Sequence, residues 1–345
     1  MAVDCLKQAT NEGATAAVLA GRGGTFIAGA DIREFGHPPI QPMLPEVCDI
    51  IEATGIPVVA AVEGNTLGGG LETALACHYR VADEKAKVGL PEVLLGILPG
   101  AAGTQRAPRA IKDPVAAVTM ISSGVPISGS KAAEIGLVDR VSKGNTVDDA
   151  VTLANEVSTE SLDGRRLSKV ELEMTPEIAA TFDAAIGEIK KKAKGAIAPV
   201  KAAECVRAAW ELPYAEGVKK ERATFQELVT SDQSNALRHI FFAERAAAKP
   251  PKNVSGTPRD VKKVGVIGAG TMGGGISMSY IEAGIPVTIL EMSDEALDRG
   301  LGVIEKNWAR GIKSGRVTEQ QVADRMALYT RTTDYADLAD CDLII

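Results

Sequence analysis

The sequence predicts an α/β protein with three successive regions: an α/β core, a mostly helical middle region and a second, smaller α/β unit. Short apolar runs of strand type, at residues 16–20 (AAVLA) and 56–62 (IPVVAAV), alternate with helical patterns in the first half of the chain. From residue 161 to residue 249 the pattern is almost entirely helical. Beyond it, residues 261–290 give a strand, a glycine-rich turn, a helix and a second strand, as in parallel sheets.

The composition is that of an ordinary soluble protein. The 345 residues include 45% hydrophobic and 24% charged residues, with a formal net charge of −7 at pH 7. This length predicts at least two domains, and the acidic balance argues against non-specific nucleic-acid binding. We expect neither a membrane span nor a signal peptide, since no apolar run is long enough. The five scattered cysteines form no CxxC pair, which favours a reducing cytoplasm over a disulfide framework.

The first elements follow from the apolar pattern and from the residues that end each run. Asn11 and Gly13 would end an amphipathic N-terminal helix. A glycine-rich turn then leads to the segment TFIAGADI, and a Pro-rich loop follows it. The expected elements are a helix over residues 1–13, a buried strand at 16–20, a loop at 36–43, a helix at 44–53 and a buried strand at 56–62.

Three glycines, Gly68, Gly69 and Gly70, lie between this last strand and an apolar helix predicted over residues 71–77. At such a strand-to-helix turn, the first N–H groups of the helix have no partner within the helix. They can hold the negative charge that develops on an oxygen atom during a reaction. Glycine also lets a ligand come close, because no Cβ atom intervenes.

Two glutamates follow turn signals in the same stretch: Glu72 comes after the glycines and Glu92 lies in the sequence GLPE. Two carboxyl groups that flank one water, together with two N–H donors, can activate that water, deliver a proton and hold the negative charge that develops on an oxygen atom. The alternative is that both glutamates are solvated surface acids.

The stretch GNTLGGGLETALACHYRVADEKAKVGLPEVLLGILPGAAGTQR, residues 64–106, resembles the signature of the enoyl-CoA hydratase (crotonase) superfamily. The segment TFIAGADI resembles the loop of that family that supplies an oxyanion N–H group and surrounds the CoA adenine. The resemblance implies a crotonase-type ββα spiral core. It also implies that Glu72 orients and activates water and that Glu92 passes the proton to C2. The implied oxyanion hole consists of Ala28 and Gly69, and the implied substrate-binding residues are Gly29, Ala30, Asp31 and Gly68.

The rest of the first half predicts further helices, separated by a short strand. Gly136 would end a capped helix before this strand. The other helices are expected over residues 104–111, 114–122 and 146–157.

The helical middle region should be interrupted by proline and glycine. A lysine run at 190–194 is interpreted as a solvated helix end, with a contact to CoA phosphates as the alternative. The helix at 236–248 resembles the linker helix of multifunctional β-oxidation enzymes. The expected breaks are Pro176, Gly195, Pro199, Pro213 and Gly217.

Residues 250–260 are polar and rich in Pro, Gly and Ser, which predicts a linker. The unit after it carries the dinucleotide-binding fingerprint in its required context: strand, GAGTMG turn, helix, strand and then an acid, Glu291. This carboxylate would accept ribose hydroxyls and repel a 2′-phosphate, which favours NAD over NADP. The opening GAGTMGGGI also resembles 3-hydroxyacyl-CoA dehydrogenases. The expected cofactor-binding residues are Gly268, Gly270, Thr271, Met272, Gly273 and Glu291.

The order of these regions resembles the bifunctional enoyl-CoA hydratase/3-hydroxyacyl-CoA dehydrogenases of fatty-acid β-oxidation. From this we expect a fragment that lacks the first strands of the core and the catalytic His–Glu pair of the dehydrogenase, for which His37, His78 and His239 cannot substitute. The expected domains are a crotonase core at 1–160, a helical region with its linker helix at 161–249, the linker at 250–260 and a partial Rossmann-type NAD-binding unit at 261–345.

The expected function is hydration of 2-trans-enoyl-CoA to (3S)-3-hydroxyacyl-CoA, with NAD-dependent dehydrogenation in the full-length protein. The alternatives are a Δ3–Δ2-enoyl-CoA isomerase at the same site, a CoA-ester- or NAD-binding remnant without turnover and, least favoured, a stand-alone dehydrogenase. Acyl-CoA esters and NAD are the expected ligands, and no metal is implied. The resemblance implies the cytoplasm of a bacterium or the peroxisome of a eukaryote, and it leaves the oligomeric state open.

Overall fold

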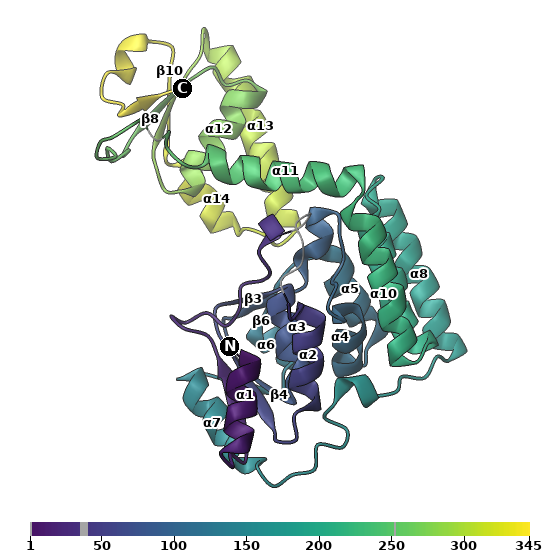
Figure 1. The fold of residues 1–345 in the computed structure, drawn as a ribbon. Coiled ribbons are helices and arrows are strands. Elements are labelled where there is room, and N and C mark those ends of the chain that lie inside the picture. The colour runs from purple at the N-terminus through teal and green to yellow at the C-terminus, as the bar shows by residue number, and fades with distance from the viewer. Residues whose placement is uncertain (1, 35–40, 252) are drawn as a thin grey trace. The chain divides into compact units, whose positions relative to one another are not determined.

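The computed structural model describes residues 2–34, 41–251 and 253–345 (Figure 1). The chain forms two compact units, Met1–Lys249 and Pro250–Ile345. The boundary falls at the first residue of the stretch for which we predict a linker. Within the described residues, no helix is both long and apolar enough to cross a membrane.

The first unit is built on a parallel four-stranded sheet with the order β1-β2-β4-β7. Its central strand β2 is buried on both faces, which explains its uninterrupted apolar sequence. The strand β1 is at the edge of this sheet and is only partly buried, so the prediction of a buried strand there was wrong. The strands are β1 (Ala17–Ala20), β2 (Val58–Val62), β4 (Tyr79–Asp83) and β7 (Arg140–Ser142).

A smaller three-stranded sheet leads into the glycine turn. Its strand β3 (Asn65–Leu67) pairs in parallel with β5 (Lys87–Gly89), which pairs antiparallel with β6 (Ile127–Ser128). The N–H of Gly68 extends the first pair by donating to the carbonyl oxygen of Gly89 at 2.9 Å. This pairing brings the end of β3 beside the chain that leads to Glu92.

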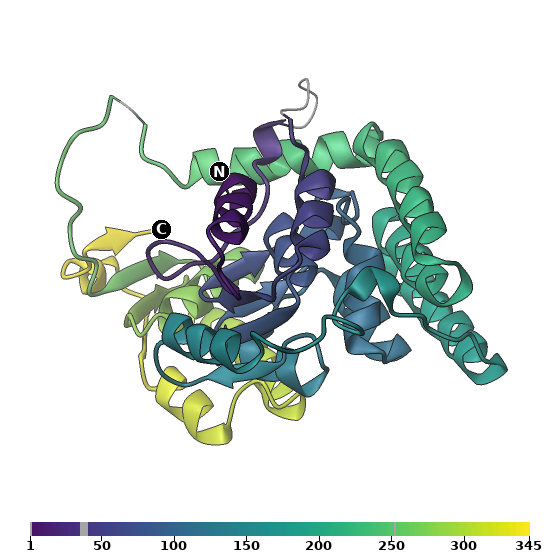
Figure 2. The ribbon, with the colours of Figure 1, turned by 60° about the horizontal axis from the view of Figure 1, so that its bottom comes forward.

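Helices cover both faces of the four-stranded sheet. On one face, α7 packs against Val59, Ala61 and Val81 (Figure 2). On the other face lies the main core, which surrounds α3 so completely that every residue of that helix is buried. A helix buried all round needs an apolar sequence all round, as the predicted helix at 71–77 has. These helices are α1 (Ala2–Asn11), α2 (Leu44–Ala53), α3 (Gly69–Ala76), α4 (Gly103–Ile111), α5 (Pro114–Ser123), α6 (Gly129–Glu134) and α7 (Thr146–Glu156).

Four longer helices complete the first unit, and one of them, α9, packs against α4, α5, α8 and α10. Two predictions for this region were wrong. Gly217 does not break α10, because it is buried in the helix where a Cβ atom would lie 2.1 Å from Gln105 Oε1. Residues 161–175 contain only a short 3₁₀ turn, η3 (Leu167–Lys169). The helices are α8 (Pro176–Ala193), α9 (Ala198–Glu211), α10 (Tyr214–Val229) and α11 (Asp232–Ala247).

The second unit has a parallel sheet of order β10-β9-β8-β11. The predicted strand, turn, helix and strand are confirmed as β8 (Val264–Ile267), α12 (Thr271–Glu282) and β9 (Val287–Leu290). The sequence analysis did not identify α14 (Glu319–Met326) or β10 (Tyr329–Thr332). The remaining elements are α13 (Asp294–Lys313), η4 (Tyr335–Leu338) and β11 (Leu343–Ile344).

Candidate active site

The glycine turn adopts a conformation that excludes other residue types. Gly68, the N-cap of α3, has φ +54° and ψ −126°, a combination that side chains with a Cβ atom avoid. A Cβ atom there would also lie 2.7 Å from Glu92 Oε1. The turn leaves the N–H groups of Gly69 and Gly70 without an acceptor among the described residues, as expected for the first turn of a helix.

The segment that contains Ala28 lies directly over this first turn of α3. A Cβ atom on Gly70 would be 1.8 Å from the carbonyl oxygen of Ile27, and one on Gly69 would be 3.7 Å from the nitrogen of Ala30. The Ala28 N–H has no acceptor in the part of the chain that the structure describes. The two predicted oxyanion donors therefore come from adjoining segments, and both are unpaired.

Glu72, one turn into α3, is buried with 3% of its surface exposed. Its Oε1 atom accepts hydrogen bonds from the N–H groups of Ala101 at 2.7 Å and Gly103 at 2.8 Å. Burial raises the pKa of Glu72 to about 7, although these two bonds and the Arg106 guanidinium oppose the rise. The other oxygen, Oε2, accepts no hydrogen bond from any described residue, so Glu72 has one anchored oxygen and one available oxygen.

Glu92 lies in the 3₁₀ turn η2 (Pro91–Leu95), which follows β5. The side chain as a whole is half-buried, but Oε2 is fully buried and has no hydrogen-bond partner among the described residues. Burial, followed by the negative charges of Glu72 and Glu221, raises the pKa of Glu92 well above its usual value. The environment of Glu92 therefore favours its protonated form, and the pKa of Glu72 lies near neutral pH.

A third buried carboxyl group, Glu221 on α10, was missed by the sequence analysis. Only 1% of its surface is exposed, and it accepts hydrogen bonds from the N–H groups of Ala102 and Thr104 and from the Thr104 hydroxyl. A glutamate in a Lys- and Glu-rich helix usually faces solvent. The available signal was the helical spacing that places Gly217, Glu221 and Leu228 on the one buried face of α10.

The buried guanidinium of Arg106, on α4, acts on the charge of Glu72. The Arg106 guanidinium forms ion pairs with Asp49 at 2.9 Å and with the buried Glu52 at 3.1 Å. It also lies over the ring of Tyr214, 5.4 Å from the ring centre. These contacts fix the charge of Arg106 near Glu72 and stabilise the ionised form of that glutamate.

One cavity of the first unit is large but is not lined by the two predicted catalytic glutamates. It has a volume of about 1020 Å³ and is lined by Arg109, Arg166 and Tyr214, among others. The arginines there already donate to carbonyl oxygens of the chain. Buried carboxyl groups and unpaired N–H groups, rather than cavity size, therefore mark the candidate site.

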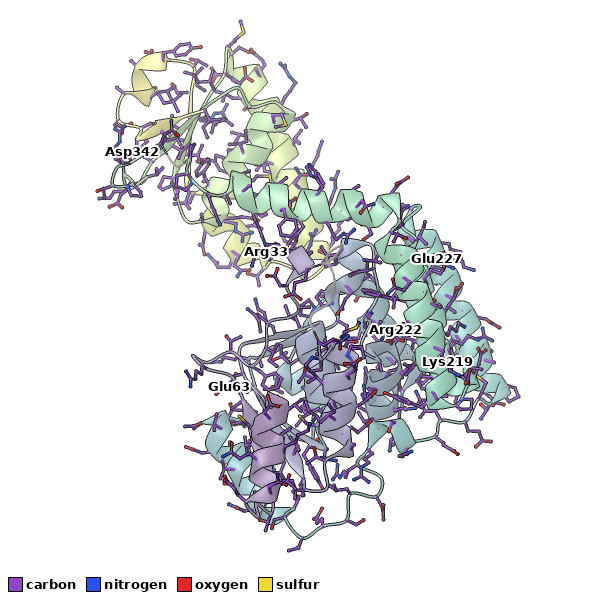
Figure 3. The ribbon with its side chains drawn as sticks, in the orientation of Figure 1. Arg33, Glu63, Lys219, Arg222, Glu227 and Asp342 are labelled. Carbon is purple, nitrogen blue, oxygen red and sulfur yellow. The ribbon has the colours of Figure 1, made fainter. Side chains whose placement is uncertain are left out.

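The remaining predicted residues of the first unit lie near its surface. Gly29 and Ala30 continue the segment over α3, and Asp31 is held by the Arg33 guanidinium at 2.6 Å, which lowers the pKa of this carboxyl to about 2. Arg33 is labelled in Figure 3. The lysine run at 190–194 ends α8 and is mostly exposed, as its solvated interpretation predicted. His37 and most of the predicted Pro-rich loop lie outside the described residues.

In the second unit, the predicted fingerprint residues surround the N-terminus of α12. Gly268 has φ +98°, and a Cβ atom on Gly273 would be 1.9 Å from the carbonyl oxygen of Gly268. Gly270, the N-cap, precedes Thr271 and the exposed Met272. Glu291 accepts hydrogen bonds from the N–H groups of Ala269 at 2.8 Å and Met292 at 3.0 Å, and these bonds lower its pKa. The N–H groups of Thr271 and Met272 have no acceptor among the residues that the structure describes, so the loop holds its acid beside free N–H groups of the helix.

Comparison with known proteins finds a family match in each unit. Residues 2–180 match the enoyl-CoA hydratase/isomerase family, and residues 263–345 match the NAD binding domain of 3-hydroxyacyl-CoA dehydrogenase. An enoyl-CoA hydratase/isomerase from Pseudoalteromonas atlantica has the same fold, with a TM-score of 0.50 and 20% identity over 70% of this chain and 84% of that one. The α/β fold class with a crotonase core is confirmed.

Longer proteins match almost the whole chain. The peroxisomal bifunctional enzyme of Danio rerio is 42% identical over an alignment of 340 residues, which covers 96% of this chain and 46% of that protein. The fatty acid oxidation complex subunit alpha of Shewanella putrefaciens is 36% identical over an alignment of 348 residues, which covers 95% of this chain and 48% of that protein. The chain therefore spans about half the length of the curated relatives that it matches.

Proposed function

Because the chain belongs to the enoyl-CoA hydratase/isomerase family, we propose that it hydrates 2-trans-enoyl-CoA to (3S)-3-hydroxyacyl-CoA in fatty-acid β-oxidation. One observation carries the proposal. Two carboxyl groups at one glycine turn have different environments: Glu72 has one oxygen held by two N–H groups and a pKa of about 7, whereas Glu92 has a buried oxygen without a partner among the described residues and a pKa raised well above its usual value. An addition that needs a base and an acid at one site uses this difference.

In the proposed reaction, Glu72 acts as the base. Its Oε1 atom is fixed by the N–H groups of Ala101 and Gly103, which leaves Oε2 to accept a proton from water. The hydroxide equivalent forms the new C–O bond at C3 of the enoyl group. Fixing one oxygen orients the other, and accurate placement of a reacting group is a large part of catalysis.

Glu92 acts as the acid, because burial and neighbouring negative charge raise its pKa and so favour its protonated form. It donates its proton to C2, so that the elements of water add across the double bond. Glu72 is then protonated and Glu92 ionised, and one proton must return from Glu72 to Glu92 before the next cycle. The unpaired Oε2 of Glu92 is an acceptor site for this return.

Negative charge develops on the thioester oxygen during the addition. In our proposal the unpaired N–H groups of Ala28 and Gly69 hold this oxygen, and Gly29, Ala30, Asp31 and Gly68 contact the CoA ester. Removal of one such donor typically lowers the rate by about 100- to 1000-fold.

A second reaction, Δ3–Δ2-enoyl-CoA isomerisation, is favoured by the unpaired carboxyl oxygen of Glu92. Shifting a double bond moves a proton from C2 to C4 and needs no activated water. The variant Glu72→Gln separates the two reactions. It should abolish hydration and retain isomerisation of a 3-enoyl-CoA. Loss of both activities in a folded variant would exclude the shared site.

We also propose that the second unit binds NAD, consistent with its family match. The unpaired N–H groups of Thr271 and Met272, with Gly268, Gly270 and Gly273 in the loop, would hold the pyrophosphate. Glu291 would accept the ribose hydroxyls. Bound NAD would supply a hydride acceptor for 3-hydroxyacyl-CoA.

Hydration is tested by the loss of the enoyl absorbance of crotonyl-CoA, followed by chiral analysis of the 3-hydroxybutyryl-CoA product. The proposal predicts turnover and the 3S product. Binding of crotonyl-CoA without any turnover by the folded chain would overturn it, in favour of a non-catalytic CoA-ester-binding protein.

A further inference from the structure

The turn that anchors Glu72 is shared with the third buried glutamate. Successive N–H groups of this turn donate alternately to two carboxyl groups. Ala101 and Gly103 donate to Glu72, whereas Ala102 and Thr104 donate to Glu221. The turn is therefore held from two sides by glutamates that lie 149 positions apart in the sequence, on α3 and on α10.

The alternation depends on an unusual backbone conformation. Ala102 has φ +69°, in the left-handed region that non-glycine residues rarely adopt. This conformation sends the Ala102 N–H away from Glu72 and toward Glu221 Oε1, at 2.7 Å. A strained residue persists only where surrounding contacts fix it, and here those contacts come from Glu221.

We propose that Glu221 is a positioning residue for hydration, which holds the turn at Ala101–Thr104 so that its N–H groups orient Glu72. The inference deepens the proposed function and rests on it. Glu221 lies on α10, outside the residues 2–180 that match the family, so a helix beyond the matched core completes the site.

The hydrogen bonds of the site specify a carboxyl group at this position. Both oxygens of Glu221 accept hydrogen bonds, and Oε2 accepts from both the N–H and the hydroxyl of Thr104. A glutamine of the same size has one acceptor oxygen, and its NH₂ group would oppose an N–H donor. Placing Glu221 beside two other acidic groups is electrostatically unfavourable, and an apolar side chain could fill the same space. Packing alone therefore gives no reason for a glutamate at this position.

Other ionisable groups lie close enough to Glu221 to interact with its charge. Burial and then the charge of Glu72 raise the pKa of Glu221 to about 8, against the effect of the Thr104 and Ala102 hydrogen bonds. The charge of Glu221 in turn raises the pKa values of Glu92 on η2, Cys205 on α9 and Tyr214 at the start of α10.

The test compares Glu221→Gln with Glu227→Gln in the full chain. Glu227 is on the same helix, labelled in Figure 3, but is exposed and paired with Lys201. We expect Glu221→Gln to lower kcat for crotonyl-CoA by roughly 10- to 100-fold, since a misplaced reacting group costs that much. KM should change by less than about twofold, because no substrate contact is lost. Glu227→Gln should match the wild type.

Two readouts separate positioning from a general structural effect. In the Glu72→Gln background, Glu221→Gln should not lower the residual rate further, because its effect acts through Glu72. Isomerisation, which needs only Glu92, should be retained. Thr104→Val removes the hydroxyl that donates to Glu221 and accepts from Gln105 Nε2, but keeps the Thr104 N–H bond to Glu221. It should lower kcat less, by about threefold to tenfold, and it provides the test if Glu221→Gln does not fold.

A readout independent of turnover distinguishes this inference from the proposed function. Hydrogen exchange of a peptide over residues 99–106 should become faster in Glu221→Gln and remain unchanged in Glu227→Gln. If the wild type does not hydrate crotonyl-CoA, the proposed function fails. In that case, faster exchange in Glu221→Gln would still show that Glu221 anchors the turn. Unchanged exchange, a wild-type kcat in Glu221→Gln, or equal losses with and without Glu72 would each overturn the inference.

Discussion

The backbone of Gly68 lies against the carboxyl group of Glu92, such that a Cβ atom on Gly68 would be 2.7 Å from Glu92 Oε1. The same residue has a φ of +54° and caps α3, the helix that carries Glu72. One glycine thus sets the direction of the helix and leaves room for the second acid. This relationship explains why the two glutamates and the glycine run occur together in the sequence.

Gly68→Ala should therefore impair both stability and hydration. The strained φ and the contact with Glu92 predict a loss of about 1–3 kcal/mol in the free energy of unfolding, and we expect kcat to fall by roughly 100-fold. The matched control is Gly144→Ala, because a Cβ atom on Gly144 meets nothing within 4 Å. Urea unfolding and crotonyl-CoA turnover measure the two effects, and a Gly68→Ala variant that resembles the control in both would contradict the account.

Hydration should depend on pH through the ionisation of Glu72. Because the base must be ionised and its pKa is about 7, kcat should fall roughly tenfold per unit as the pH drops well below 7. At high pH, ionisation of Glu92 should lower kcat again. Steady-state kinetics between pH 5 and pH 10 provide the profile. A kcat that stays constant from pH 5 to pH 7 would exclude Glu72 as the base.

The free energy of unfolding should also depend on pH. It should fall as the pH rises toward 7, whereas kcat should rise over the same range. The pKa of Glu72 is raised from 4.5 to about 7 on folding, so the unfolded chain releases this proton first. Its contribution is fully present below about pH 4.5 and is lost as the pH rises toward 7. Glu72→Gln should flatten the fall of the free energy of unfolding across this range. An unchanged slope in the variant would show that the pKa of Glu72 is not raised.

Close packing of the glycine-rich loop should be essential in the second unit. A Cβ atom on Gly273 would lie 1.9 Å from the carbonyl oxygen of Gly268, whereas one on Gly275 meets nothing within 4 Å. We expect Gly273→Ala to destabilise the unit by about 1–3 kcal/mol and to weaken NAD binding at least tenfold. Gly275→Ala serves as the control, and calorimetry measures binding. Equal affinities for both variants would contradict the proposed role of the loop.

The sequence predicted the features that depend on local chain geometry. Glu72 and Glu92 are separated by one helix, two short strands and a turn, so a single stretch of residues 67–106 contained nearly the whole site. The strand, turn, helix and strand of the dinucleotide fingerprint were likewise local. The prediction for residues 44–53 matched α2 at both ends, since its apolar periodicity begins and stops with the helix.

What the sequence did not predict depends on contacts between distant segments. Glu221 looks like any charged residue of an exposed helix until α10 packs against the start of α4. Gly217 was predicted to break that helix, but in the structure it makes room for Gln105. The strand β1 has an apolar sequence suited to a sheet centre, yet its position in the strand order leaves it partly exposed.

The central claim is that Glu72 and Glu92 are the base and the acid of one hydration reaction. The most direct test measures kcat for crotonyl-CoA in the wild type, Glu72→Gln, Glu92→Gln and Glu134→Gln, an exposed glutamate paired with Lys131. The account predicts a loss of at least about 100-fold in each of the first two variants and wild-type turnover in the third. Wild-type turnover in either Glu72→Gln or Glu92→Gln, with the fold retained, would contradict it.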